Sequence, residues 1–348
     1  MLNIIIFKIT FLSILSFLWA WMWTPILHRL LVRYNLVKRI RDEGSTPLYS
    51  ALHKQKEGTP TMGGILIWTT PFLFALFFAY LAFLFDDTLI DQLNFLSRAQ
   101  VFLPLGALVA SALVGVVDDL LNIKRIGKFS GLSVRHRFAL YTIIASVGAW
   151  WFYFKLDWDI LHVPFVGDFN MGLWYIPIFI FVIVATAFSV NEVDGLDGLA
   201  GGTLLAAFAS FGAIAFIQGR VDLAAFCAVI IGALLAFLWF NIYPAKFFMG
   251  DTGSMSLGVT LGIVAMLTNT ALLLPIICFL YVIETGSVIV QTISKKWFGR
   301  KIFLSTPFHH HLEARGWKEP TIVMRFWVIA GVTSVIGVII VLAERGLY

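Results

Sequence analysis

Charged residues are scarce in this sequence, and their scarcity excludes an ordinary water-soluble globule. Only 13% of the 348 residues are Asp, Glu, Lys or Arg, about half the usual share of a soluble domain, whereas 59% are hydrophobic. A lipid bilayer can accommodate such a chain if each apolar run satisfies its own backbone hydrogen bonds as a helix. The composition therefore predicts an all-α, polytopic integral membrane protein.

Cysteine is also scarce, which excludes a disulfide framework or a cysteine-based metal cluster. Cys227 and Cys278 both lie inside apolar runs with no metal-ligand residue beside them, so we interpret them as packing residues. The N-terminal apolar run lacks a basic leader and a small-residue cleavage site, and we expect a retained helix rather than a signal peptide. Since no internal repeat or low-complexity segment is evident, residues 1–348 are expected to form one domain.

Ten apolar runs approach the length of about 20 residues that a membrane-spanning helix needs. The eighth run is short, and an even number of spans places both termini on the same side. The predicted spans are 4–26, 64–85, 101–117, 138–154, 173–190, 199–217, 223–239, 254–267, 271–293 and 322–342.

The basic residues are distributed very unevenly between the two sides of these spans. Connections after the odd-numbered spans, with their flanks, hold 20 of the 25 Lys and Arg residues. The other side keeps only Lys8, Arg98, Lys155, Arg220 and Arg345. Because cytoplasmic loops are enriched in Lys and Arg, the odd connections are predicted to be cytoplasmic and both termini periplasmic.

Asp118 and Asp119 directly follow the third predicted span. Two adjacent carboxylates at a membrane boundary repel each other, and partial burial raises the cost of ionising both. A divalent cation or the basic residues that follow would relieve that cost. The alternative is a solvated helix end, and from this pair alone the two interpretations are equally favoured.

The stretch 191–202, with the sequence NEVDGLDGLAGG, lies on the same side and opens the sixth predicted span. Asp194 and Asp197 are three residues apart and share a face if this turn is helical. The glycines allow a ligand to approach the backbone closely, and carboxylate oxygens suit Mg²⁺. The alternative is a helix N-terminus capped by acids.

Further candidates follow the same pattern at the predicted cytoplasmic ends. Asp251 lies between glycines in FMGDTGS, where helix capping is the alternative to ligand binding, and Asn241 precedes it. A run of three histidines, here His309, His310 and His311, is rarely structural. A transition-metal site is one interpretation, but adjacent residues cannot easily share one metal ion. A loop that positions the substrate is therefore favoured. His28, His53, His136 and His162 stand singly and are assigned no role.

Glu284 lies about 11 residues before Lys295, or about 16 Å along a helix, which predicts a position near the bilayer midplane. An ionisable residue at that depth is a functional candidate. A protonated residue that holds two helices together is the favoured alternative.

Taken together, these motifs resemble the polyprenyl-phosphate N-acetylhexosamine-1-phosphate transferase superfamily, and within it the phospho-N-acetylmuramoyl-pentapeptide transferases. The resemblance runs over nearly the whole chain. Its motifs are 58–64 (GTPTMGG), 115–119 (GVVDD), 194–200 (DGLDGLA), 238–241 (LWFN), 248–251 (FMGD) and 307–313 (PFHHHLE). One departure is Glu192-Val193, where the family usually has Leu-Thr; the added negative charge puts metal affinity or local geometry in doubt.

The resemblance implies that UDP-N-acetylmuramoyl-pentapeptide and undecaprenyl phosphate react to give lipid I and UMP, the first membrane step of peptidoglycan synthesis. It implies a single transmembrane transferase domain of ten helices in the bacterial inner membrane, among membrane lipids, with its active site facing the cytoplasm. It also implies Mg²⁺ dependence and a homodimer, and no nucleic-acid partner is expected.

The roles implied for individual residues are hypotheses. Asp251 is the leading Mg²⁺ ligand, with Asp119 or Asp194 near it, and Asp118 is the candidate base that deprotonates the lipid phosphate; a covalent aspartyl-phosphate route is the competing scheme. His310 and His311 are expected to position the diphosphate or the sugar. The remaining substrate-binding candidates are Lys56, Thr61, Asn191, Asp194, Asp197, Asn241, Phe248 and His309.

Two other functions compete with this interpretation. A relative that uses UDP-N-acetylglucosamine would share most of these motifs. A secondary transporter would place ionisable residues near the midplane, whereas here only Glu284 is predicted at that depth and the other candidate acids cluster at one face.

Overall fold

The structure is a computed structural model that describes residues 2–37, 56–85, 88–124 and 131–347. The basic residues predicted for segments 38–55 and 125–130, together with His53, lie outside the described residues. The helices are α1 (Leu2–Arg33), α3 (Ile65–Leu84), α4 (Thr88–Leu93), α5 (Phe102–Lys124), α6 (Val134–Lys155), α7 (Tyr175–Val193), α8 (Leu199–Ile217), α9 (Val221–Asn241), α10 (Asp251–Leu267), α11 (Leu274–Ile277), α12 (Phe279–Phe298), α13 (Phe308–Ala314) and α14 (Glu319–Leu347).

A helix occupies each of the ten predicted spans, and α8 matches its prediction residue for residue. Within the described residues, seven helices are long and apolar enough to cross a membrane, or eight if a bent pair of helices counts as one span. The protein is therefore a mostly helical, polytopic membrane protein. The prediction of a purely helical chain is wrong in one place, because Ile160–Val163 (β1) and Gly167–Asn170 (β2) form an antiparallel hairpin.

The centre of the bundle is built from α9 and α10. α9 packs against α1 and α8, and α10 packs against α5 and α7. Small residues allow the close approach: a Cβ on Gly258 of α10 would lie 2.7 Å from Cα of Ala187 on α7. The hydroxyls of Ser256 and Thr260 in α10 each donate to the carbonyl four residues earlier, at 2.7 Å, so these polar groups are satisfied without water.

The outer surface of the bundle is apolar. Phe83, Phe181 and Trp239 are exposed by 83%, 72% and 68%, although burying such side chains would be favourable in water. Contact with lipid tails removes these side chains from water just as burial inside a protein would. Both Cys227 and Cys278 are buried in the bundle, as their interpretation as packing residues predicts.

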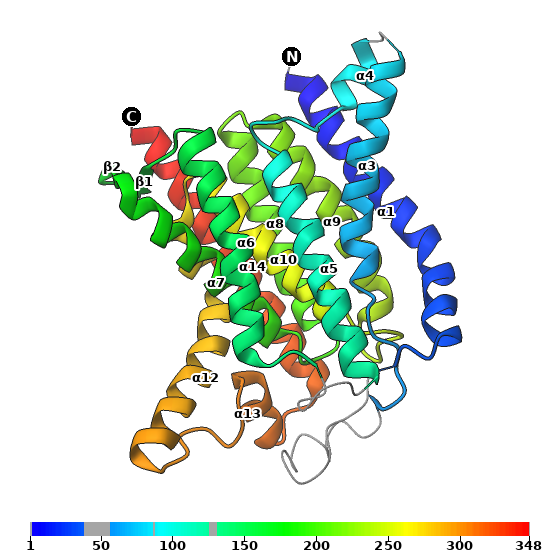
Figure 1. Cartoon of the computed structure of the whole chain (residues 1–348), viewed down its shortest axis with the longest axis vertical. Helices are drawn as coiled ribbons and strands as arrows, with labels where there is room; N and C mark the ends of the chain where they lie inside the picture. The colour runs from blue at the N-terminus through cyan, green and yellow to red at the C-terminus, as the bar shows by residue number, and fades with distance from the viewer. Residues whose placement is uncertain (1, 38–55, 86–87, 125–130, 348) are drawn as a thin grey trace.

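The ninth predicted span is not one straight helix. Residues Ala271–Ile277 and Phe279–Phe298 are bent by 84° relative to each other at Cys278. Pro275, at the start of α11, lacks the N–H that a continuous helix would require there. As a result, α12 leans away from the bundle and projects beyond it together with α13 (Figure 1).

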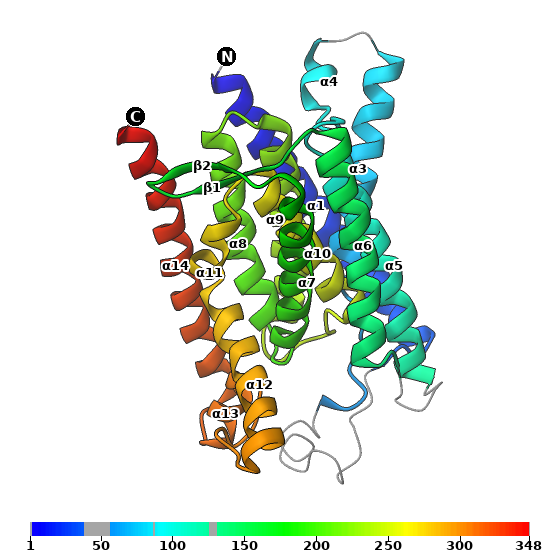
Figure 2. The ribbon, with the colours of Figure 1, turned by 60° about the vertical axis from the view of Figure 1, so that its left-hand side comes forward.

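The two ends of the molecule differ in character. Both chain ends and the β1–β2 hairpin lie at one end, and α13 with the start of α14 lies at the other (Figures 1 and 2). The carboxyl ends of α5, α7 and α9 and the amino ends of α8, α10 and α14 share that second end (Figure 1). The segments carrying the predicted site residues therefore meet at the end of the bundle remote from the termini.

Candidate active site

The three central aspartates sit on helices rather than in connections. Asp118 and Asp119 belong to the last two turns of α5, and Asp251 is the first residue of α10. The apolar runs predict these aspartates in the connections after residue 117 and before residue 254, and this placement is corrected because α5 continues to Lys124 and α10 begins at Asp251. Both helices extend past their apolar runs because their polar side chains are paired inside the protein.

Arg137 of α6 gathers two of these aspartates. Its Nε lies 2.7 Å from Oδ2 of Asp118, and its Nη2 lies 3.1 Å from Oδ2 of Asp251. Its Nη1 donates to Oδ1 of Asn191 on α7, at 3.1 Å. One guanidinium thus draws together α5, α7 and α10, and it offsets part of the repulsion between two carboxylates.

Asp251 has further partners and remains partly accessible. Its Oδ1 accepts from Nδ2 of Asn191 at 2.7 Å, and its Oδ2 accepts from Nδ2 of Asn122 at 3.3 Å. Its side chain is 14% exposed, whereas that of Asp118 is fully buried. Of the two, Asp251 is therefore the carboxylate that a ligand can reach without a rearrangement.

Asp119 caps the helix that begins at Asp251. Its Oδ1 accepts from the main-chain N–H of Asp251 at 3.1 Å, and its Oδ2 accepts from that of Thr252 at 3.0 Å. A carboxylate at a helix N-terminus is favourable both as a hydrogen-bond acceptor and towards the helix dipole. The capping interaction considered for Asp251 is therefore made by its neighbour Asp119, which leaves the Asp251 side chain directed to other partners.

Glycines explain how the loop 58–64 supports Asp251. The N–H groups of Gly63 and Gly64 donate to the carbonyls of Phe248 and Met249, both at 2.8 Å, so the two motifs pair backbone to backbone. A Cβ on Gly115 of α5 would lie 2.4 Å from the carbonyl oxygen of Asp251. Thr61 is buried in this contact and its hydroxyl lies beside Gly250.

A second charged cluster forms around Lys56. Its Nζ lies 2.6 Å from Oδ1 of Asp197 and 2.5 Å from Oε1 of Glu319 at the start of α14. Glu319 also accepts from the N–H of Asp197, at 2.7 Å. The Lys56 ammonium lies 5.9 Å from the centroid of the Phe248 ring, which places a cation beside an aromatic face.

Asn241 fixes the turn that carries Asp197. Its Oδ1 accepts from the N–H of Gly198 at 3.0 Å, and its Nδ2 donates to the carbonyl of Phe247 at 2.8 Å. Gly198 has a φ of +79°, a conformation that favours glycine. Asn241 thus locks the end of α9 to this turn.

The three consecutive histidines make three different sets of contacts. Nδ1 of His310 lies 2.6 Å from Oε2 of Glu313. Nδ1 of His311 accepts from the N–H of Leu304 at 3.1 Å. His309 is fully buried against Glu284. The rings of His309 and His310 lie edge to face with their centroids 4.1 Å apart, yet the three histidines have different polar partners.

Glu284 holds the first of these histidines in place. Its two carboxylate oxygens accept from the N–H of His309 at 3.1 and 3.2 Å, and its Oε2 lies 3.0 Å from Nδ1 of the same residue. Glu284 therefore links α12 to α13, in agreement with the interhelical role favoured from the sequence, whereas its depth in the bilayer stays a prediction. The bend at Cys278 redirects α12, so Glu284 meets the histidine loop at the site end.

The turn between α7 and α8 touches all of these groups. Asn191, just before it, bonds Asp251, and Asp197, within it, pairs with Lys56. A Cβ on Gly195 would lie 2.3 Å from Nε2 of His309, so the histidine packs directly on this turn. Residues 191–198 therefore join the Asp251 cluster, the Lys56 cluster and the histidine loop into one site.

The structure brings the predicted metal ligands together only in part. Within the described residues, no three His, Cys, Asp or Glu side chains are grouped so that they could hold a metal ion. Asp194 lies at the C-terminal end of α7, three residues beyond Asn191, and is half-buried. The set Asp119, Asp194 and Asp251 is therefore not a preformed cage.

Sequence reasoning missed three partners in this site. Arg137 was counted only as a basic loop residue, and Glu319 and Asn122 were assigned nothing. Asn122 lies four residues after Asp118, on the same helical face, and that spacing could have indicated it. Arg137 and Glu319 carried no such signal, because their partners are far away in the sequence.

Comparison with known proteins identifies the family. A family model described as glycosyl transferase family 4 matches residues 101–269, and signature 1 of phospho-N-acetylmuramoyl-pentapeptide-transferase matches residues 56–67. The transferase of that name from Chloroflexus aurantiacus is 39% identical over 88% of this chain and 82% of its own length. The transferase from Desulfosudis oleivorans is 37% identical over 96% of this chain and 92% of its own length. The transferase from Geobacillus sp. is 37% identical over 94% of this chain and 96% of its own length.

The chain belongs to the phospho-N-acetylmuramoyl-pentapeptide-transferase family. The resemblance drawn from the motifs is thereby confirmed. The protein is a membrane-embedded transferase of peptidoglycan synthesis. The family match at residues 56–67 begins with Lys56 and covers the loop that pairs with 248–249, and the longer match includes both aspartates of α5, Asn191 and Asp251.

Proposed function

We propose that the site at the end of the bundle remote from the termini carries out the family reaction, making lipid I and UMP from UDP-N-acetylmuramoyl-pentapeptide and undecaprenyl phosphate. The observation that carries this proposal is the convergence of three polar clusters on the turn 191–198. One cluster is acidic and partly accessible, one presents a cation beside an aromatic ring, and one presents histidines. These are the groups needed to hold a diphosphate, a nucleoside and a sugar.

We also propose how the protein lies in the membrane. All ten helical segments span the bilayer as a single transferase domain, with the site end in the cytoplasm and both termini in the periplasm. The excess of Lys and Arg in the odd-numbered connections supports this orientation. The nucleotide comes from water and the lipid from the bilayer, and the cytoplasmic boundary is where both can arrive. A homodimer in the bacterial inner membrane is part of the same proposal.

Asp251 is the proposed principal ligand of Mg²⁺. The donor set suits that ion, because Asp251 offers a partly exposed carboxylate and Mg²⁺ is commonly held by one or two carboxylates plus substrate phosphates. When bound, Mg²⁺ would neutralise the diphosphate and stabilise UMP as it leaves. Asp119 contributes chiefly by capping α10 and aiming Asp251, and Asp194 remains a candidate ligand on the adjoining turn.

Asp118 remains the candidate base for the lipid phosphate. In the proposed step its carboxylate takes the proton, a lipid phosphate oxygen bonds to the phosphorus attached to the sugar, and the bond from that phosphorus to the UMP oxygen breaks. Asp118 is fully buried against Arg137, so this role requires Arg137 to move towards the incoming phosphate. The covalent route, in which an aspartate first takes the phospho-sugar, is the competing scheme.

The remaining residues are proposed to hold the substrates. Lys56 faces phosphate, while Phe248 beside it stacks on uracil. Asn191, Asp197 and Asn241 shape the nucleotide site through the turn 191–198, and Thr61, beside Gly250, supports the segment that carries Asp251. His310 and His311 position the diphosphate or sugar, and His309 anchors their helix.

Release of UMP by the purified protein tests the proposed reaction. We expect release with UDP-N-acetylmuramoyl-pentapeptide and undecaprenyl phosphate, and loss of release when Mg²⁺ is chelated and regained when it is restored. UDP-N-acetylglucosamine in place of the muramoyl substrate should give only background release. Equal turnover of both nucleotide sugars would contradict the substrate assignment, and vesicle uptake without UMP would indicate a transporter.

A further inference from the structure

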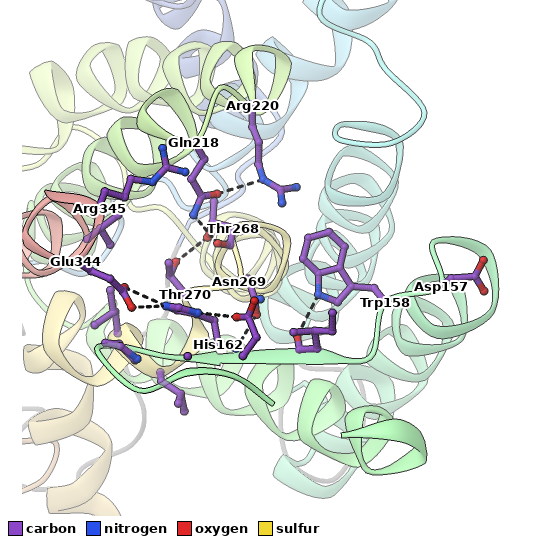
Figure 3. A pocket seen from close by; sticks show the side chains of 17 residues that line it. Asp157, Trp158, His162, Gln218, Arg220, Thr268, Asn269, Thr270, Glu344 and Arg345 are labelled. Carbon is purple, nitrogen blue, oxygen red and sulfur yellow. Dashed lines mark hydrogen bonds and ion pairs between the residues drawn. The ribbon is translucent and has the colours of Figure 1, made fainter. Parts of the chain in front are cut away.

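A polar cavity lies at the opposite end of the molecule from the candidate active site. Its volume is about 690 Å³, and it lies among the β1–β2 hairpin, the segment between α8 and α9, the end of α10 and the end of α14 (Figure 3). The transfer reaction proposed above makes no use of this cavity. Its lining includes Trp158, His162, Arg220, Glu344 and Arg345.

Two guanidinium groups in this cavity have no acidic partner among the residues that the structure describes. Arg220 donates from Nε to Oε1 of Gln218 at 3.1 Å, and its guanidinium lies 5.0 Å from the Trp158 ring centroid. Arg345 donates from Nη1 to the carbonyl of Ile217. Within the described part of the chain, neither forms an ion pair with a carboxylate. Burial lowers the pKa of Arg220, because desolvation disfavours the charged guanidinium.

Two of the three acids that line the cavity, Asp168 and Glu344, pair with His162. His162 lies between these two acids, with Nδ1 at 2.7 Å from Asp168 and Nε2 at 2.9 Å from Glu344. Burial alone would lower the pKa of His162, but the hydrogen bonds and charges of these two carboxylates outweigh it and raise the pKa. Asp157 lies at the far edge of the cavity, beyond Trp158 (Figure 3). Within the described residues, Arg220 and Arg345 are therefore the cations of the cavity without a carboxylate partner, and Asp157 lies apart from them (Figure 3).

We propose that this cavity binds a phosphate group, held by Arg220 and Arg345, as the headgroup of an anionic lipid. Guanidinium groups match phosphate oxygens in geometry and charge. The lining also includes Leu272, whose apolar side chain is 44% exposed and suits an acyl chain better than water, and the buried Val341. Trp158 has the mixed character of residues at a membrane interface. In the proposed orientation the lipid belongs to the outer leaflet.

Titration with short-chain lipids tests this site. The full-length protein in detergent is titrated with dihexanoyl phosphatidylglycerol and, separately, with dihexanoyl phosphatidylcholine, and binding is followed by native mass spectrometry. We expect selective binding of phosphatidylglycerol and a loss of affinity of about tenfold or more in the double variant Arg220→Gln/Arg345→Gln, since hydrogen bonds to charged groups are among the stronger ones. Inorganic phosphate forms a third arm.

The matched control is Arg98→Gln/Lys155→Gln, which removes two exposed cations from the same end of the molecule but outside the cavity lining. It should bind the lipid like the wild type, and both double variants should keep normal UMP release. If the cavity double does not fold, Arg345→Gln alone, at an exposed side chain, should still weaken binding. Displacement of the lipid by millimolar phosphate would identify a free-anion site instead. Equal affinity in all variants, or equal loss in both doubles, would overturn the proposal.

Discussion

Replacing Glu284 by Gln tests whether this residue positions the histidine loop. The substitution keeps the shape of the side chain but removes its charge and turns one acceptor into a donor. The carboxylate now accepts from both the N–H and the ring of His309, and both residues are fully buried. One of these interactions must therefore be lost or reversed in the variant.

The size of the effect follows from those contacts. A hydrogen bond to a charged group contributes about 1.5–3 kcal/mol, and a buried group left without its partner costs a similar amount. If that energy is lost from the productive position of α13, turnover falls about 10- to 100-fold, since 1.4 kcal/mol corresponds to a factor of ten. Because α13 is short and at the edge of the bundle, the melting temperature should fall only slightly.

The assay is UMP release at varied UDP-N-acetylmuramoyl-pentapeptide and saturating Mg²⁺. Glu57→Gln, the same chemical change at an exposed side chain near the site, is the control and should leave kcat/KM unchanged. Glu284→Asp should recover part of the lost activity because it restores the charge. Wild-type kcat/KM in Glu284→Gln, with an unchanged melting temperature, would refute a positioning role.

Three further changes probe other contacts. Lys56→Met leaves two carboxylates without their cation, so it should destabilise the protein by about 3 kcal/mol and abolish UMP release. Lys246→Met, at an exposed lysine, is the control and should change neither thermal unfolding nor activity. Gly115→Ala places a methyl group against the backbone at the start of α10, which should lower the free energy of unfolding by about 1–3 kcal/mol and reduce both the melting temperature and the activity. An unchanged melting temperature and activity would disprove that contact. Because the pKa of His162 is raised in the folded state, its stabilisation is complete below the unfolded pKa of about 6.5 and is lost as pH rises through the folded pKa. After correction for the intrinsic exchange rate, hydrogen exchange of the β1–β2 hairpin should therefore speed up from pH 6 to pH 8 more in the wild type than in His162→Gln. Parallel pH profiles of the two proteins would contradict this prediction.

Much of the architecture was predictable because it depends on local sequence. Continuous apolar runs specify helices in a bilayer, and α8 begins and ends where its run does. The gathering of acids, glycines and histidines at one end followed from counting spans. Even the short run at 254–267 forms a helix, and its serine and threonine hydroxyls are satisfied by carbonyls of the same helix.

What could not be predicted depends on contacts between distant segments. The run 271–293 reads as continuous, yet the chain bends at Cys278 and carries Glu284 to His309. Arg137 is an ordinary member of a basic segment until the fold places it between Asp118 and Asp251. Such pairings depend on how the helices pack, and no local pattern encodes them.

Mg²⁺ dependence of UMP release in Asp251→Asn tests the proposed site most directly. The amide keeps the volume of the side chain and can still accept from Asn191, but its NH2 group replaces the oxygen that pairs with Arg137 and Asn122, so we expect a folded protein with a lowered melting temperature. Loss of the principal ligand should lower turnover by about a thousandfold or more even at saturating Mg²⁺. Near-normal turnover with an unchanged Mg²⁺ half-saturation would contradict the assignment of Asp251 and, with it, the account of the site.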